Sequence, residues 1–399
     1  MEKYFLFPTC VVEKELLYSI THNNCIIEKI DLKNNKVICI DNPDGYNSKE
    51  WSGADNILLY NQKIYFFEQN GKRIMEYSVT DKKTRYFDLN LQAYLYFNYA
   101  YCTIWDNRIY IFPSFINEII IVDLQTGKIM KKEKFCDDLY YIFNKEKINC
   151  IPGTDLNFPY RLFSCGCQVK NTIWIFTEKS QKVIKFDLLT EKIEQYILPR
   201  MIKGCVHAVW KNKKFYLLSL EGFVYVWKYE KNEIEMLYDE KKNCQYPYFH
   251  RIAVTDKNIW LIPFFGDDIY IVDKMTKKYS FYNEYPKDFC YFGGYERCRF
   301  YGYSEDKNNY YFAMHSANYL LIIDKLTGKE KWIKPINPTM QEMQKYYMKN
   351  YGSNFNEYEW KLKNYLKFSL SKKNIQDNSS IGNLIWENMF NLKIGERNN

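Results

Sequence analysis

The 399-residue sequence contains no apolar stretch long enough to cross a membrane. Its first residues, "MEKYFLFPTCVVEKELLY", also lack the basic lead, the longer apolar run and the small-residue cleavage site of a signal peptide. These absences predict a soluble, cytoplasmic protein with no membrane among its partners.

The sequence also lacks pairs of cysteines at the spacing that metal sites use. The twelve cysteines include no C-x-x-C pair, and Cys165 and Cys167 are separated by one residue, which is a poor spacing for zinc. Without a secretion signal, we expect reduced and mostly buried thiols rather than disulfides. A metal bound by His207 and His250 would lack a third ligand, so we predict neither a metal nor a cofactor.

Common catalytic motifs do not occur either. The sequence has no G-x-S-x-G, no P-loop, no H-E-x-x-H and no D-x-D-x-D loop. The formal net charge is +8, but the lysines are spread along the chain instead of forming the basic stripe that a nucleic-acid groove needs. These features favour a binding protein over an enzyme and argue against nucleic acid as a partner.

A repeated pattern dominates what is present, in a chain with 19% aromatic residues. Residues 109–135, "IYIFPSFINEIIIVDLQTGKIMKKEKF", read as strand, strand, turn and strand, and the pattern returns at 259–282. Aligned on one aromatic of the second strand, it occurs seven times. The anchors, 42 to 64 residues apart, are Tyr18, Tyr65, Tyr110, Trp174, Tyr216, Trp260 and Tyr311.

Such a period is typical of propeller blades of four strands, A to D, in which each blade covers the apolar face of the next. The turn between strands C and D carries a column of aspartates, which we interpret as acceptors for turn amides rather than calcium ligands. The column is Asp31, Asp123, Asp187, Asp273 and Asp324, replaced by Ser78 and Lys228 in the second and fifth repeats. The segment 3–7 is expected to pair with blade seven and help close the ring.

Over about residues 4–335 the repeats resemble the β-propeller superfamily, with kelch, WD-repeat and YVTN/quinoprotein-like proteins as the nearest groups. "VDLQTGK" (122–128) and "IDKLTGK" (323–329) are similar to the YVTN and quinoprotein style, whereas Gly293–Gly294 does not occupy the kelch position. The resemblance implies an all-β, seven-bladed propeller of four-stranded antiparallel blades, which we assign to residues 1–337.

The character of the sequence changes at its C-terminal end, which we predict to be a small helical extension spanning residues 338–399. Three segments, 339–351, 356–370 and 380–393, combine helical periodicity with good helix formers. Their apolar faces predict packing on the propeller or on a partner.

In a four-stranded meander, the D–A connectors and the B–C loops lie on one face of the ring. The D–A connectors are long and varied here, and variable loops on a rigid scaffold are where binding sites are usually found. Arginines, histidines and aromatics gather near this face. The predicted ligand-binding residues are Arg161, His207, His250, Arg251, Arg297, Arg299, His315, Trp51, Tyr248 and Tyr295.

Cationic donors among aromatic walls suit a carboxylate, a phosphate or an acidic sugar, because guanidinium presents a planar fork to paired oxygens. We therefore predict a monomeric binding propeller that recognises a partner protein or an anionic ligand at this face. Two alternatives stay open. The residues can serve only to satisfy strand ends, or a lyase or hydrolase can use His207, His250 or Glu296 as a general base or acid.

Overall fold

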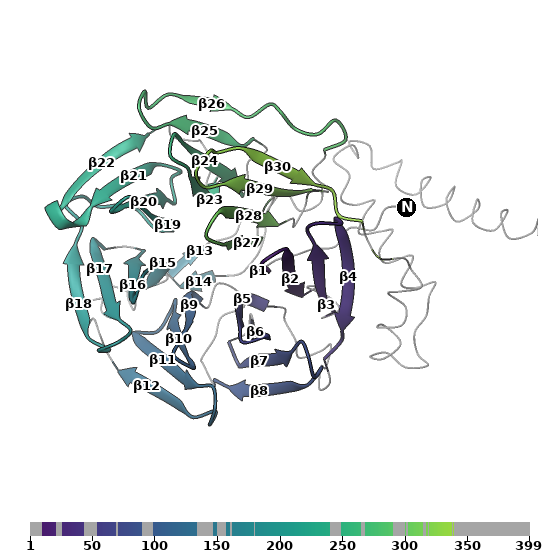
Figure 1. Cartoon of the computed structure of the whole chain (residues 1–399). Coiled ribbons are helices and arrows are strands. Elements are labelled where there is room, and N and C mark those ends of the chain that lie inside the picture. The colour runs from purple at the N-terminus through teal and green to yellow at the C-terminus, as the bar shows by residue number, and fades with distance from the viewer. Residues whose placement is uncertain are drawn as a thin grey trace, which may run out of the picture.

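The computed structural model describes most of the repeat region of the chain. The described residues are 10–20, 26–43, 54–68, 71–89, 99–133, 147–149, 157–159, 162–178, 180–239, 249–264, 268–289, 300, 302–313, 317, 319–336 and 338. They form seven four-stranded antiparallel sheets, each with its strands in chain order, arranged radially around one axis (Figure 1). The predicted seven-bladed β-propeller is confirmed.

The blades are numbered in chain order, and each runs from an inner strand A to an outer strand D. Blade one consists of β1 (Cys10–Glu13), β2 (Leu16–Ile20), β3 (Ile27–Asp31) and β4 (Lys36–Asp41). Blade two consists of β5 (Ala54–Tyr60), β6 (Lys63–Glu68), β7 (Arg73–Ser78) and β8 (Thr84–Asp88). Blade three consists of β9 (Tyr99–Trp105), β10 (Arg108–Pro113), β11 (Glu118–Asp123) and β12 (Ile129–Glu133). The four strands predicted for the third repeat agree with β9 to β12 within a few residues at their ends.

The remaining blades follow the same order. Blade four has β15 (Phe163–Val169), β16 (Thr172–Thr177), β17 (Lys182–Asp187) and β18 (Ile193–Ile197), and blade five has β19 (Cys205–Lys211), β20 (Lys214–Ser219), β21 (Val224–Lys228) and β22 (Glu233–Tyr238). Blade six has β23 (Phe249–Val254), β24 (Asn258–Pro263), β25 (Tyr270–Asp273) and β26 (Tyr279–Phe281). Blade seven has β27 (Gly302–Glu305), β28 (Asn309–Ala313), β29 (Leu320–Asp324) and β30 (Glu330–Ile333).

The core lies in the seams between neighbouring blades. All seven anchor aromatics lie in B strands, and a strand such as β10 is buried on both faces because it has a blade on either side. Between blades three and four, the rings of Phe112 and Phe186 meet at 5.7 Å. Between blades four and five, Trp174 packs on the fully buried Trp227 at 5.8 Å. Each blade therefore supplies the core that its neighbour lacks.

The aspartate column caps the C–D turns, as predicted. Asp123 accepts the amides of Gln125 and Thr126 at 3.1 and 2.7 Å, and the Thr126 hydroxyl at 2.8 Å. Equivalent bonds occur at the other four aspartates. In blade two Ser78 accepts the amide of Asp81, while blade five replaces the turn with a short 3-10 helix, Tyr229–Lys231.

The ring is closed by the chain that follows blade seven. Ile336 forms a parallel bridge with Lys36 at the start of β4: its amide donates to Asn35 at 2.7 Å, and its carbonyl accepts from Val37 at 2.9 Å. Inside the ring, the Val12 amide donates to the Ser304 hydroxyl at 3.0 Å. Blade one thus contacts blade seven at both its outer and its inner strand.

Several predictions fall outside the described residues, namely the pairing of segment 3–7 and all of the helical extension after residue 338. The long connector before blade four contains one unpredicted element, a hairpin of β13 (Lys147–Asn149) and β14 (Asn157–Pro159). Among the described residues, no helix is long and apolar enough to cross a membrane.

Candidate anion-binding site at the channel mouth

The seven A strands surround the axis, and each begins on the face of the D–A connectors (Figure 1). In blades two to six the A strand contains a β-bulge near this beginning. A bulge changes the direction in which the following side chains point. Directly after it, at one register, stand Asn56, Tyr101, Cys165, His207 and Arg251.

His207 links two blades. Its side chain is 8% exposed, and its Nδ1 accepts the backbone amide of Ile252 in β23 at 3.1 Å. Burial lowers the pKa of His207 well below its usual value, and the positive charge of Arg251 lowers it further. The ring is therefore neutral and, because Nδ1 is an acceptor, carries its proton on Nε2 as a hydrogen-bond donor.

Arg251 lies one blade further round. Its Cζ stands 5.6 Å from the centre of the Tyr303 ring in β27, and one guanidinium nitrogen donates to the His250 carbonyl at 3.2 Å. The bulged residue His250 packs edge-on against Phe264 at 4.6 Å. A half-buried guanidinium thus stands at the connector end of the inner strands.

Tyr303 connects these two groups. Its ring meets His207 edge-on at 4.9 Å and faces Arg251, so side chains from blades five, six and seven converge. Its hydroxyl is buried and has no hydrogen-bond partner in the described part of the chain. Buried hydroxyls are nearly always paired with protein or water, so this one marks a place for a further polar group.

Other side chains of the inner strands, from blades three, four and seven, lie near enough to influence one another's ionisation. Burial raises the pKa of Tyr101, Cys167 and Tyr303, and the nearby Glu305 carboxylate raises all three further. Tyr101 crosses from blade three over Gly166, where an added Cβ would lie 2.5 Å from the Tyr101 Cβ.

The structure describes three of the predicted ligand residues. It brings His207 and Arg251 together at Tyr303, whereas the His250 ring packs against Phe264. The other seven predicted ligand residues lie outside the described residues, as does the candidate general acid or base Glu296. They are Arg161, Arg297, Arg299, His315, Trp51, Tyr248 and Tyr295. Tyr303 and Tyr101 were missed by sequence reasoning, although Tyr101 occupies the same register as His207 and Arg251 once the A strands are aligned on the anchors.

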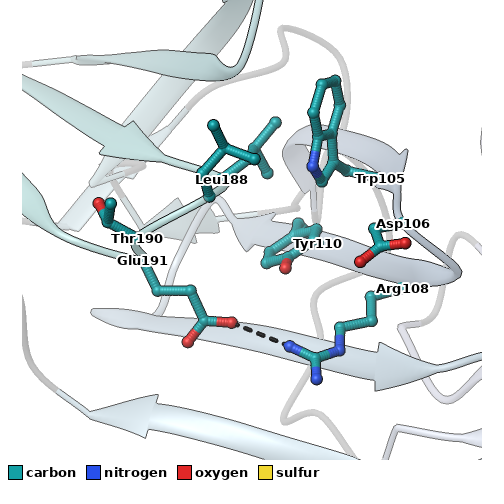
Figure 2. Close-up of a pocket in the computed structure, with 8 residues that line it drawn as sticks. Trp105, Asp106, Arg108, Tyr110, Leu188, Thr190 and Glu191 are labelled. Carbon is teal, nitrogen blue, oxygen red and sulfur yellow. Dashed lines mark hydrogen bonds and ion pairs between the residues drawn. The ribbon is translucent and has the colours of Figure 1, made fainter.

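A separate pocket of about 350 Å³ opens on the other face, between blades three and four (Figure 2). Trp105, Tyr110 and Leu188 line it, and an ion pair of 3.2 Å between Arg108 and Glu191 bridges the two blades. Sequence reasoning missed it, because that face carries only short turns. In the described residues, no three His, Cys, Asp or Glu side chains are grouped to hold a metal ion.

Comparison with known proteins relates the chain to others by fold alone. No family model matches it, and no curated protein matches its sequence. It is similar to the extracellular domain of the putative one component system BT4673 from B. thetaiotaomicron, at 11% identity and a TM-score of 0.52 over 80% of this chain. That alignment covers 41% of the other chain, so our chain spans less than half of its length.

Two further structures have lower scores. BamB from Moraxella catarrhalis gives a TM-score of 0.46 at 11% identity, covering 78% of this chain and 82% of that one. The computationally designed Ika8 protein gives 0.48 at 10% identity, covering 83% and 96%. The propeller fold is consistent with a binding or interaction role in general.

Proposed function

We propose that the protein is a binding propeller that takes up an anionic group at the connector-side mouth of its channel. One observation carries the proposal: the side chains of Arg251, His207 and Tyr303 meet there from three blades, with Arg251 and His207 each in contact with the Tyr303 ring. The anionic group is a carboxylate, a phosphate or an acidic sugar, borne by a small molecule or by a partner protein.

The chemistry of the three groups supports an anion over a cation. Arg251 remains charged at any physiological pH and would repel a cation. His207 remains a neutral donor, since its Nδ1 is already occupied by the Ile252 amide. The Tyr303 hydroxyl can donate a third hydrogen bond, and bonds to a charged oxygen are about twice as strong as neutral ones.

The alternative, a catalytic base in the channel, gains no support from His207. A general base must accept a proton, yet its Nδ1 is engaged, and burial with the Arg251 charge disfavours the imidazolium. The same engagement explains why a histidine occurs at this register: it satisfies an edge-strand amide of the next blade.

Replacing Arg251 with alanine is expected to weaken anion binding by about 30-fold, since it removes the charged member of the site. The measurement is the ligand-induced rise in melting temperature with citrate, inorganic phosphate and galacturonate as probes, and galactose as the neutral comparison. Arg200→Ala is the matched control. Arg200 lies in a D–A connector away from the channel, and its guanidinium also stands beside a tyrosine ring, that of Tyr225, at 5.7 Å. The site would be refuted if none of the acids raised the melting temperature of the wild type. It would also be refuted if Arg251→Ala and Arg200→Ala showed the same ligand-induced rise.

A reducing compartment, the cytoplasm, is part of the same proposal. None of the six described cysteines forms a disulfide, and the Cys165 thiol donates a hydrogen bond to the Cys205 Sγ at 3.5 Å. Burial raises the pKa of Cys10 to about 12, which keeps such a thiol unreactive. Structural thiols of this kind are typical of intracellular proteins.

A further inference from the structure

A lysine recurs at one register of the C–D turns, on the face opposite the proposed anion site. It stands five residues after the capping position in six of the seven blades, and each of the six is exposed. The lysines are Lys36, Lys83, Lys128, Lys192, Lys278 and Lys329. Within the described part of the chain, none of these six ammonium groups forms an ion pair. They surround the turn face as an outer ring of free positive charge.

Apolar side chains project from the tips of three of the same turns. Two residues after the capping aspartate stand Leu189, Met275 and Leu326, which are 68%, 91% and 68% exposed. The residue just before each tip behaves differently: Leu188, for example, is buried in the seam. The exposed tips contribute nothing to the core, so their apolar surface is available to a partner.

Among the described residues, the aspartates of these turns are charged but form no ion pair with the lysines of the ring. Each directs Oδ1 into its own turn, where amides hold the carboxylate; at Asp273 the donors are Met275 and Thr276 at 2.9 and 2.8 Å. Those amide bonds lower the pKa of Asp273, and the lysine that lowers it further is Lys257, not Lys278. The ring lysines themselves are exposed.

We propose that the turn face docks on an anionic phospholipid surface, with the lysines at the headgroups and the tips of blades four, six and seven inserted between them. Each Lys near an anionic leaflet contributes attraction, and projecting aliphatic groups add burial in the interface. All C–D turns of a propeller lie on one face of the ring, because every blade has the same strand order, so these groups can reach a flat surface together.

The residue types at the turns favour lipid over other polyanions. Single-stranded nucleic acid is bound by aromatic platforms, whereas these tips are aliphatic. Arginine is the usual reader of phosphate forks, and two arginines at these turns are already engaged: Arg108 pairs with Glu191, and Arg85 donates to the Leu124 carbonyl at 3.1 Å. The sequence predicted no membrane partner because no apolar run spans a bilayer, but a peripheral contact requires only scattered tips.

The test is sedimentation of the full chain with vesicles of phosphatidylcholine, with and without phosphatidylserine. We expect binding only to the phosphatidylserine vesicles, decreasing as salt is raised. Lys278→Glu with Lys329→Glu should reduce the affinity more than tenfold, and Met275→Ser with Leu326→Ser about tenfold. Glu233→Lys, which supplies the one lysine missing from the ring, should increase it about fivefold.

Matched controls come from D–A connectors. Lys287→Glu changes an exposed lysine and Met201→Ser a methionine that is also exposed, and both should bind vesicles as the wild type does. Equal binding to both vesicle types, or equal losses in the control and turn variants, overturns the proposal. So does tighter binding to poly-glutamate or to a DNA duplex than to phosphatidylserine vesicles, because the face would then serve another polyanion.

Discussion

Replacing Glu28 with glutamine is expected to make the protein more stable at pH 8 and to have little effect near pH 4. Glu28 is fully buried in β3, and burial raises its pKa well above the usual value. Strand alternation places it on the same face as Ile26 and Ile30, which pack in the cluster shared with blade seven. A neutral carboxylic acid therefore occupies the seam where the ring closes.

The direction of the pH effect follows from proton binding. The unfolded chain releases this proton from about pH 4.5, whereas the folded protein retains it up to the raised pKa. Between those two values stability falls with pH by up to ~1.4 kcal/mol per pH unit. Glutamine keeps the shape and removes the titration, so this part of the slope should disappear.

Urea unfolding at several pH values measures this. Glu13→Gln is the control, since it removes an exposed carboxyl from the same blade and should leave the slope unchanged. An identical slope in wild type and Glu28→Gln would show that Glu28 ionises normally and that the closing seam is open to water.

Substituting Gly166 with alanine should cost about 3 kcal/mol of unfolding free energy, and valine more. An added Cβ would lie 2.5 Å from the Tyr101 Cβ and 2.7 Å from Ile175 Cδ1. The Tyr101 Cβ is bonded directly to the backbone of β9, so no side-chain rotation can move it away. The glycine is thus required by a close approach between blades, not by an unusual backbone angle.

A double-mutant comparison isolates this contact. In a Tyr101→Ala background, Gly166→Ala should cost clearly less, because the crowding atoms are gone. The same register in blade five already holds Ala208, which shows that alanine fits where no tyrosine crosses. If the alanine costs as much free energy without Tyr101 as with it, Tyr101 does not pack against Gly166.

The strands were predictable from the sequence because each repeat contains the same local signals. Central strands such as β10 read as continuous apolar runs, and the aspartate column marks where strand C ends. How the ring closes was not predictable, because the bridge between Lys36 and Ile336 depends on backbone hydrogen bonds that carry no side-chain signature.

The site was predictable only in part. The sequence singled out His207 and Arg251 as polar residues at the start of inner strands, but not Tyr303, since tyrosine is common in every blade. It also gave no means of separating a ligand role for His207 from a structural one. The hydrogen bond from Ile252 makes that distinction, and it exists only when blades five and six are adjacent.

Nitrogen-15 NMR of the His207 ring, assigned with His207→Asn, tests most directly whether the propeller brings blades five and six together at the connector-side mouth of the channel. A ring buried beside Arg251 and accepting the Ile252 amide should remain in the neutral Nε2–H form across the pH range in which an ordinary histidine titrates. Titration with a midpoint near the ordinary value of 6.5 would show an exposed, unengaged imidazole, and the anion site would lose its geometry.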